Sequence, residues 1–185
     1  SLLKRKENYI PLFTLVSCAL LGGFDDWSNI KGWWAKGIPV TPKFIFLLLL
    51  SLFGAWWFYV KLGFTGFSIP FYGFVELGPW YLLLFVLVFI ASGHAVNITD
   101  GLDGLAAGLL IMSFSVFGVI AFTQGMLLLA TLCGVIVGSL TAFLWYNLNP
   151  AQFFMGDLGS LSLGCTLGVI ALLTDSLAPL ILCSL

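Results

Sequence analysis

Five aspartates fall in three polar stretches that interrupt an otherwise apolar sequence: Asp25 and Asp26, then Asp100 and Asp103, and then Asp157. Carboxylate oxygens are the ligands that Mg²⁺ prefers, and Mg²⁺ usually binds one or two of them together with substrate phosphates. Two adjacent carboxylates also repel each other, so the pair at 25–26 favours a general base or metal site over a solvated loop start, which remains an alternative. The aspartates therefore predict Mg²⁺ chemistry on a diphosphate.

The second stretch also has a purely structural interpretation. Asp100 precedes a helix that we expect to begin near Leu102, where a carboxylate can cap free N–H groups, and Asp103 would lie in its first turn. Capping does not require Asn97, nor the two glycines near Asp103. Those glycines indicate a close backbone approach to a ligand. Both interpretations stay open at this point.

The third stretch runs from Asn147 to Asp157 and contains the pair Phe153 and Phe154. Asp157 can cap a helix that we expect to begin near Leu158. An aromatic pair beside an acid can stack on a flat ligand such as a base, or it can anchor the chain at a membrane interface.

Lysines follow the first acidic pair at positions 31, 36 and 43. A lysine near a helix start often only extends its charge to water, but opposite carboxylates it can hold phosphate as a point charge. His94, the single histidine, is expected to be a hydrogen-bonded structural residue. No Walker loop or Gly-x-Gly-x-x-Gly run is present, so a nucleotide cradle of the soluble type is not predicted.

The elements that position these residues are transmembrane helices. Of the 185 residues, 61% are hydrophobic and 8% charged, and the mean hydropathy is +1.11; soluble domains are about half apolar and a quarter charged. A helix needs about 20 mostly apolar residues to cross a bilayer. We predict spanning helices at roughly 10–24, 43–62, 79–96, 102–122, 126–147 and 158–174.

The predicted fold is therefore all-α: a polytopic transmembrane helix bundle forming a single domain over 1–185. About six helices span the lipid bilayer, residues 177–185 begin a further one, and a short β-hairpin is an option in the outer loop 63–78. The small-xxx-small glycine pairs predict close helix packing. They are Gly104/Gly108, Gly134/Gly138 and Gly164/Gly168.

Alternating spans sort the polar loops onto two sides of the membrane. The loops 25–42, 97–103 and 147–157 share one side, and the loops 63–78, 123–125 and 175–176 share the other. All five aspartates of the three stretches then lie on one face. The net charge of −1 indicates no nucleic-acid partner. Lysines occur on both sides, so the positive-inside rule does not identify the face.

The sequence resembles the phospho-N-acetylmuramoyl-pentapeptide transferase family of bacterial membrane enzymes. Three motifs carry the resemblance across nearly the whole chain. They are Gly23-Phe24-Asp25-Asp26 with Lys36, Gly37 and Lys43, the run Ala95–Ala106, and the run Phe143–Asn147 leading into Pro150–Leu161. Two positions depart from the family, which often has Asn in place of His94 and Lys in place of Asn29.

The resemblance implies roles for individual residues. Asp25 and Asp26 would activate or position a polyprenyl phosphate, Asp157 would be catalytic and bind Mg²⁺, and Phe154 would lie beside uracil. The remaining substrate-binding residues would be Lys43, Asn97, Asp100, Asp103 and Asn147.

The resemblance further implies the reaction. Undecaprenyl phosphate attacks the β-phosphate of UDP-MurNAc-pentapeptide and releases UMP in peptidoglycan synthesis, directly or through an aspartyl-phosphate. The loops that carry the motifs would be cytoplasmic, in the bacterial inner membrane, and a homodimer stays open. The family's upstream segment and its downstream histidine-rich loop are not in this sequence, so we expect the central part of a longer enzyme, inactive by itself.

Three other functions compete with this one. A sister polyprenyl-phosphate N-acetylhexosamine-1-phosphate transferase would share the acidic motifs, although the compact Trp-Tyr-Asn-x-x-Pro-Ala run favours the muramoyl enzyme. A transporter would place charge at helix centres, which costs about 2.5–3.5 kcal/mol per residue and is nearly absent here. A purely structural membrane protein would have no use for the acids.

Overall fold

The computed structural model describes residues 9–31, 40–63, 66–69, 73–177 and 179–180. Its elements are α2 (Tyr9–Lys31), α3 (Val40–Trp57), the π-helix η1 (Phe58–Leu62), β1 (Gly66–Ile69), β2 (Gly73–Glu76), the 3₁₀-helix η2 (Gly78–Trp80), α4 (Tyr81–Thr99), α5 (Leu105–Thr123), α6 (Leu127–Asn147) and α7 (Gly156–Leu173). Within these described ranges, six helices are long and apolar enough to cross a membrane. The all-α prediction is confirmed, and β1 and β2 form the antiparallel hairpin in the loop 63–78. Most of the predicted seventh segment, 178 and 181–185, lies outside the described residues.

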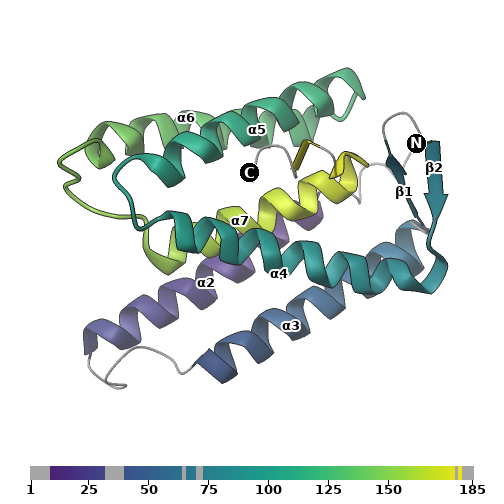
Figure 1. Cartoon of the computed structure of the whole chain (residues 1–185), viewed down its shortest axis with the longest axis horizontal. Coiled ribbons are helices and arrows are strands. Elements are labelled where there is room, and N and C mark those ends of the chain that lie inside the picture. Colours follow the sequence, from purple (N-terminus) through teal and green to yellow (C-terminus); the bar gives the residue numbers. More distant parts are fainter. Residues whose placement is uncertain (1–8, 32–39, 64–65, 70–72, 178, 181–185) are drawn as a thin grey trace.

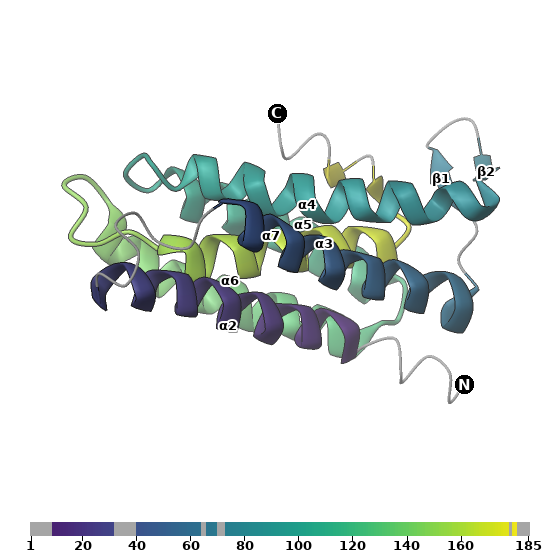
Figure 2. The same ribbon diagram turned by 90° about the horizontal axis from the view of Figure 1, so that it is seen from below.

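Helix α7 is the centre of the bundle. It packs against α2 on one side and α4 on the other, while α5 and α6 pair above it and α3 pairs with α4 (Figures 1 and 2). About 72% of its most apolar 18-residue window is buried, compared with 22–39% for the other five spanning helices. The spanning helices other than α7 therefore present much of their apolar surface outward, as helices in lipid do.

Small residues allow the close packing around α7. A Cβ added at Gly164 would lie 2.6 Å from the Ser92 carbonyl oxygen and 2.8 Å from Gly93 Cα. Gly168 likewise meets Ser92, so the predicted packing role of the Gly164/Gly168 pair is confirmed.

The other two glycine pairs behave differently. A Cβ at Gly108, Gly134 or Gly138 would meet no described atom within 4 Å, so within the described chain these glycines pack against no helix. Gly104 lies in a turn and has φ +73°, a left-handed conformation that favours glycine. Within the described residues the packing prediction was wrong for Gly108, Gly134 and Gly138, whereas a Cβ at Gly104 would lie 3.5 Å from Leu144 Cδ1 near the end of α6.

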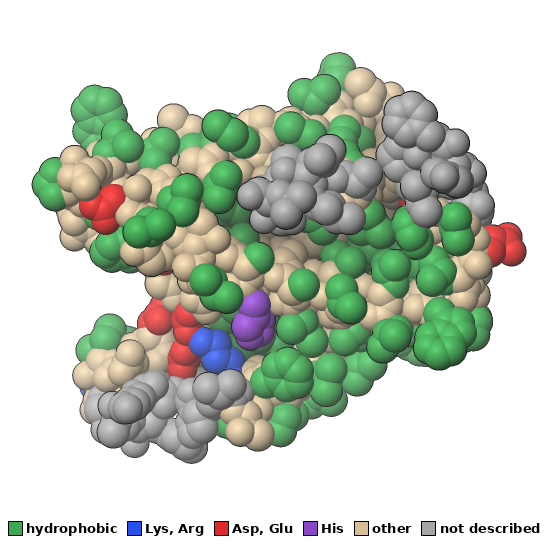
Figure 3. Space-filling view, viewed as in Figure 1, with side chains coloured by type: hydrophobic (Ala, Val, Ile, Leu, Met, Phe, Trp, Pro, Cys, Tyr) green, Lys and Arg blue, Asp and Glu red, His purple; other side chains and the backbone are tan. Residues whose placement is uncertain are grey.

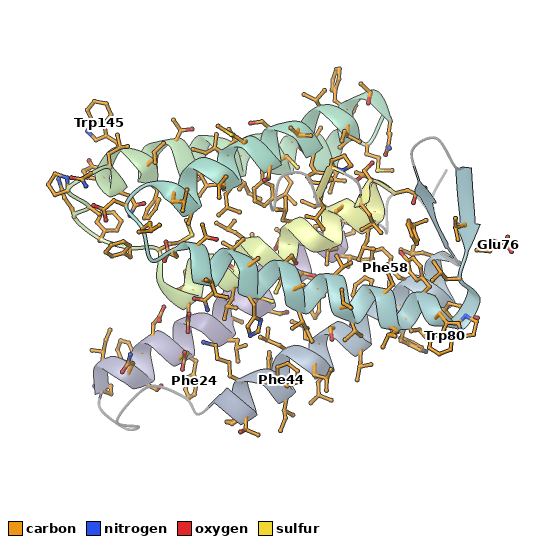
Figure 4. The ribbon with its side chains drawn as sticks, in the orientation of Figure 1. Phe24, Phe44, Phe58, Glu76, Trp80 and Trp145 are labelled. Atoms are coloured by element: carbon orange, nitrogen blue, oxygen red, sulfur yellow. The ribbon has the colours of Figure 1, made fainter. Side chains whose placement is uncertain are left out.

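The polar loops gather at one end of the bundle as predicted. The last turns of α2, α4 and α6 and the first turns of α3, α5 and α7 lie together at the left of Figure 1, and the hairpin lies at the opposite end. Glu76 and Trp80 mark the hairpin end, and Trp145 marks the other (Figure 4). Trp80 is 69% and Trp145 79% exposed, which suits the two membrane interfaces.

Two helix boundaries differ from the prediction in ways that matter for the site. Helix α2 does not end at residue 24 but continues through Asp25 and Asp26 to Lys31, because its buried face continues through Gly22, Asp25 and Ser28 at helical spacing. Helix α5 begins at Leu105 instead of 102.

The late start of α5 changes the roles expected of two aspartates. Asp100 is the C-cap residue of α4, and Asp103 lies in the turn before α5 rather than in its first helical turn. Neither carboxylate caps α5, whose N-cap residue is Gly104 and has no side-chain capping bond.

Candidate active site

The N-terminus of α7 is the point where the acids converge. Asp100 Oδ2 accepts the Gly156 N–H at 2.9 Å, and Asp26 Oδ2 accepts the Leu158 N–H at 3.1 Å. Asp157 lies in the first turn of the same helix. Free N–H groups and the positive end of the helix dipole stabilise carboxylates here. The predicted capping role of Asp100 is thus correct in kind, but the helix that it caps is α7.

Lys43 links the carboxylates of Asp25 and Asp157, and the three residues come from three different helices. Lys43, in the first turn of α3, donates from Nζ to Asp25 Oδ2 at 2.9 Å and to Asp157 Oδ2. Asn97, near the end of α4, donates from Nδ2 to Asp157 Oδ1 at 2.8 Å. Acidic and basic side chains lie beside the histidine in a hollow at this end of the molecule (Figure 3).

The electrostatic environment of this cluster favours cations. Asp25 and Asp157 contact the ammonium of Lys43, and the carboxylates of Asp26 and Asp100 accept N–H groups at the adjacent start of α7. Among the described lysines, only Lys43 pairs with any of these four carboxylates. The side chains of Lys43, Asp25 and Asp157 are only 19%, 11% and 21% exposed, so solvent screens their charges less than it screens a surface pair.

Among the described residues outside the spanning helices, Asp100 is the one whose carboxyl has a perturbed pKa. Partial burial raises its pKa above the usual aspartate range, and the negative charges of Asp157 and Asp26 act in the same direction. The hydrogen bonds from the backbone of Gly156 and Met155 oppose this rise. Burial prevails because removing the carboxylate from water disfavours its charged form.

The loops 100–104 and 148–155 are joined by two side chains. Asn147, which is 1% exposed, accepts the Gly104 N–H at 3.0 Å and donates to the Phe153 carbonyl at 2.8 Å. Asp103 Oδ2 accepts the Ala151 N–H at 3.2 Å. Asn147 and Asp103 therefore hold the two loops in register beside the cluster.

The two phenylalanines of the aromatic pair have different surroundings. The ring of Phe153 lies 5.4 Å from Phe143 and 6.0 Å from Tyr146, centroid to centroid. Phe154 is 50% exposed and makes no ring contact with a described residue. Phe153 therefore stabilises the loop, whereas the ring of Phe154 is available to a ligand.

The remaining polar candidates lie outside this cluster. Lys31 lies over the ring of Trp27 at 5.3 Å, and His94 Nδ1 lies 3.1 Å from the carbonyl oxygen of Ile90, one turn earlier on the same helix. The expected structural hydrogen bond of His94 is present. Lys36 lies outside the described residues.

Two glycines that position the site were missed at the sequence level. A Cβ at Gly22 would lie 2.5 Å from the carbonyl carbon of Asp157 and 2.7 Å from Leu158 Cα, so only glycine lets α2 approach the start of α7 this closely. Gly156 has φ +68°, and a Cβ there would lie 3.0 Å from Asp26 Oδ2. Their adjacency to the Asp-Asp pair and to Asp157 was the available signal.

The donor set fits a Mg²⁺ ion. Within the described ranges, no three His, Cys, Asp or Glu side chains form a complete ligand cluster. Mg²⁺ does not need one, because it binds one or two carboxylates and completes its shell with water and substrate phosphates. Asp25 and Asp157 already converge on one cationic group, the ammonium of Lys43, which shows that their oxygens can share a cation.

Fold and site together define a multi-pass membrane-helix bundle with an acidic polar site at one end. Comparison of sequences then places the chain: it belongs to glycosyl transferase family 4, whose profile matches residues 9–175.

Curated relatives agree with this assignment. The chain is 42% identical to the phospho-N-acetylmuramoyl-pentapeptide-transferase of Chloroflexus aggregans, over 93% of this chain and 49% of the relative. It is 38% identical to the enzyme of the same name from Clostridium perfringens strain SM101, over 95% of this chain and 54% of the relative. It is 37% identical to that of Listeria innocua, over 89% of this chain and 51% of the relative. The chain spans about half the length of these relatives. The six candidate spans and the bacterial relatives make it part of a multi-pass bacterial membrane protein. The family resemblance expected from the motifs is confirmed.

Proposed function

We propose that the whole protein transfers phospho-MurNAc-pentapeptide from UDP-MurNAc-pentapeptide to undecaprenyl phosphate, with release of UMP, in a Mg²⁺-dependent step of peptidoglycan synthesis. The observation that supports this most directly is the convergence of Asp25, Asp157 and Lys43 from three membrane helices on one point. The names of the relatives describe transfer of the same group, phospho-N-acetylmuramoyl-pentapeptide.

In this proposal Asp157, with Asp25 beside it, holds Mg²⁺. The bound ion would supply charge neutralisation for the diphosphate. A phosphate oxygen of undecaprenyl phosphate forms the new bond to the β-phosphorus, and the bond from that phosphorus to the oxygen of the UMP phosphate breaks. Asp26, whose carboxylate accepts the Leu158 N–H, would position the attacking lipid phosphate.

The other site residues bind the nucleotide side of the substrate. The exposed ring of Phe154 stacks on uracil, and Lys43 attracts the phosphates as a point charge. Asn97, Asp100, Asp103 and Asn147 shape this side of the cleft through the hydrogen bonds described above.

The site end of the bundle is proposed to face the cytoplasm across the bacterial inner membrane. A UDP-sugar is made and kept in the cytoplasm, and its charged diphosphate cannot enter the hydrocarbon core. All four carboxylates of the cluster lie at this end, where a water-soluble nucleotide can reach them.

The test is UMP release by the purified full-length protein in detergent with undecaprenyl phosphate, supplied either with UDP-MurNAc-pentapeptide or with UDP-N-acetylglucosamine. We expect turnover with the muramoyl substrate, its loss on chelation of Mg²⁺ and in Asp157→Asn, and a normal rate in the matched control Glu76→Gln at the hairpin end. Turnover only with UDP-N-acetylglucosamine would identify the sister enzyme instead. A normal rate in Asp157→Asn would remove the metal assignment.

A further inference from the structure

Lys43 occupies an unusual position for a residue of α3. Helix α3 packs mainly against α4 and has few contacts with α2. Nevertheless the Lys43 side chain reaches the carboxylate of Asp25 on α2 and that of Asp157 on α7. Of the described lysines, Lys43 is the one that enters the acidic cluster, since Lys31 lies over Trp27 and Lys61 is near the far end of the same helical segment.

The two oxygens of Asp157 both have protein donors. Oδ1 accepts the Asn97 amide at 2.8 Å, and Oδ2 accepts the Lys43 ammonium. A divalent cation on Asp157 would therefore lie beside the Lys43 ammonium. Two cations that share one carboxylate repel each other strongly where solvent does not fully screen their charges. Lys43 and a divalent cation compete for the same carboxylate.

Without any cation, however, Asp25 and Asp157 would also repel each other. They come from α2 and α7, which pack closely at Gly22. A positive charge between these carboxylates stabilises that packing, and the ammonium of Lys43 supplies it at 2.9 Å from Asp25 Oδ2.

We propose that Lys43 is a built-in counter-ion that holds Asp25 and Asp157 together until a divalent cation binds Asp157 and displaces its ammonium. This inference rests on the proposed function, which assigns the cation to Asp157. The flexible four-carbon stem of lysine allows the ammonium to leave Asp157 while it stays near Asp25. The displaced charge is then free for a substrate phosphate, so Lys43 couples metal loading to substrate binding.

The first test measures Mn²⁺ binding to the full-length protein by electron paramagnetic resonance, without substrates. Lys43→Met removes the charge and keeps the length of the stem, and it should bind Mn²⁺ at least about tenfold more tightly than the wild type. Lys43→Arg keeps the competing charge and should stay close to the wild type. Lys61→Met, the matched lysine near the opposite end of the segment, should also leave Mn²⁺ affinity unchanged. Equal or weaker binding in Lys43→Met overturns the inference.

A second measurement needs no variant and covers the case in which Lys43→Met does not fold. Reductive dimethylation of the wild type, read by mass spectrometry, reports how accessible each amine is. The ratio of Lys43 to Lys61 labelling should rise when EDTA is replaced by Mg²⁺, because displacement frees the Lys43 amine. A ratio that is unchanged or lower overturns displacement.

These outcomes separate the inference from the proposed function. Mn²⁺ binding that is real but indifferent to Lys43 overturns the counter-ion role alone. Failure of both wild type and Lys43→Met to bind Mn²⁺ overturns the counter-ion role and the metal assignment together.

Discussion

Replacing Gly22 with alanine should separate α2 from the start of α7 and disturb the acidic site. The new Cβ would lie 2.5 Å from the Asp157 carbonyl carbon and 2.7 Å from Leu158 Cα. These are backbone atoms of a buried helix, so they cannot rotate away as the tip of a side chain can. Inserting a methyl group into such a contact costs about 1–3 kcal/mol.

Gly23→Ala is the matched control on the same helix. Its Cβ would lie 3.0 Å from Leu158 Cδ1, the movable end of a side chain that is 50% exposed. Alanine also has a higher helix propensity than glycine by up to about 1 kcal/mol. Gly23→Ala should therefore be neutral or slightly stabilising. The propensity gain is common to both positions, so the two adjacent variants should differ by the clash cost of about 1–3 kcal/mol.

The assay is thermal unfolding of the full-length protein in detergent, together with the rate of UMP release. Gly22→Ala should unfold at a lower temperature and lose rate, since moving α2 away lengthens the contacts of Asp25 and Asp26 with Lys43 and Leu158. A misplacement of about 1 Å can lower a rate about 100-fold. If Gly22→Ala matches Gly23→Ala in both measurements, close approach of the two helices does not position the acids, and that part of the reasoning fails.

Three further predictions concern the loops. The pKa of Asp100 is raised in the folded protein, so its contribution to stability is complete below the ordinary aspartate pKa of about 3.8 and is lost as pH rises through the raised value. The melting temperature of Asp100→Asn should therefore increase relative to that of the wild type between pH 4 and 7. A difference that stays constant over this range would contradict the prediction. Asn147→Ala removes the side-chain partner of the part-buried Gly104 N–H and Phe153 carbonyl and should cost about 1–3 kcal/mol in denaturant unfolding. An unchanged midpoint would show that water replaces the amide. Phe154→Ala should raise the KM for the UDP-sugar about tenfold with little change in melting temperature. Phe153→Ala should mainly lower the melting temperature, because its ring packs within the loop. The reverse pattern would exchange the roles of the two residues.

Some features of the fold and site were predictable because they depend on composition and chain order. Long apolar segments define membrane helices without knowledge of their neighbours, and alternation of spans placed Asp25, Asp100 and Asp157 at one end of the bundle. Helix boundaries beside the acids were less predictable. Hydropathy predicted the end of α2 before Asp25, but α2 continues because Asp25 and Ser28 lie on its buried face and their polar atoms have partners. Asp25 accepts a hydrogen bond from Lys43 of α3, and Ser28 donates to the Asp25 carbonyl of the same helix.

The hydrogen-bond partners of the acids and the packing neighbours of the glycines were not predictable from the sequence. An aspartate can cap any helix start within reach, and from sequence Asp100 had a helix immediately after it, yet it accepts the Gly156 N–H of α7 from 56 residues away. Identical glycine spacing likewise marks a tight contact at Gly164 but none with the described chain at Gly134. Spacing reports which residues share a helix face, and only the neighbouring helix decides whether that face is covered.

The sequence by itself determined that this is a membrane-helix bundle, that its acids share one face, and that its motifs resemble those of a sugar-phosphate transferase family. Hydrophobicity and chain order are properties of the sequence itself, so they can be determined without knowledge of the tertiary structure. Only the tertiary structure decided that Lys43, rather than Lys31, bridges Asp25 and Asp157, and that Gly22 permits their approach. Those contacts join α2 and α3 to α7, which is distant from both in sequence, and the packing of these helices is set by side-chain shape across the whole bundle.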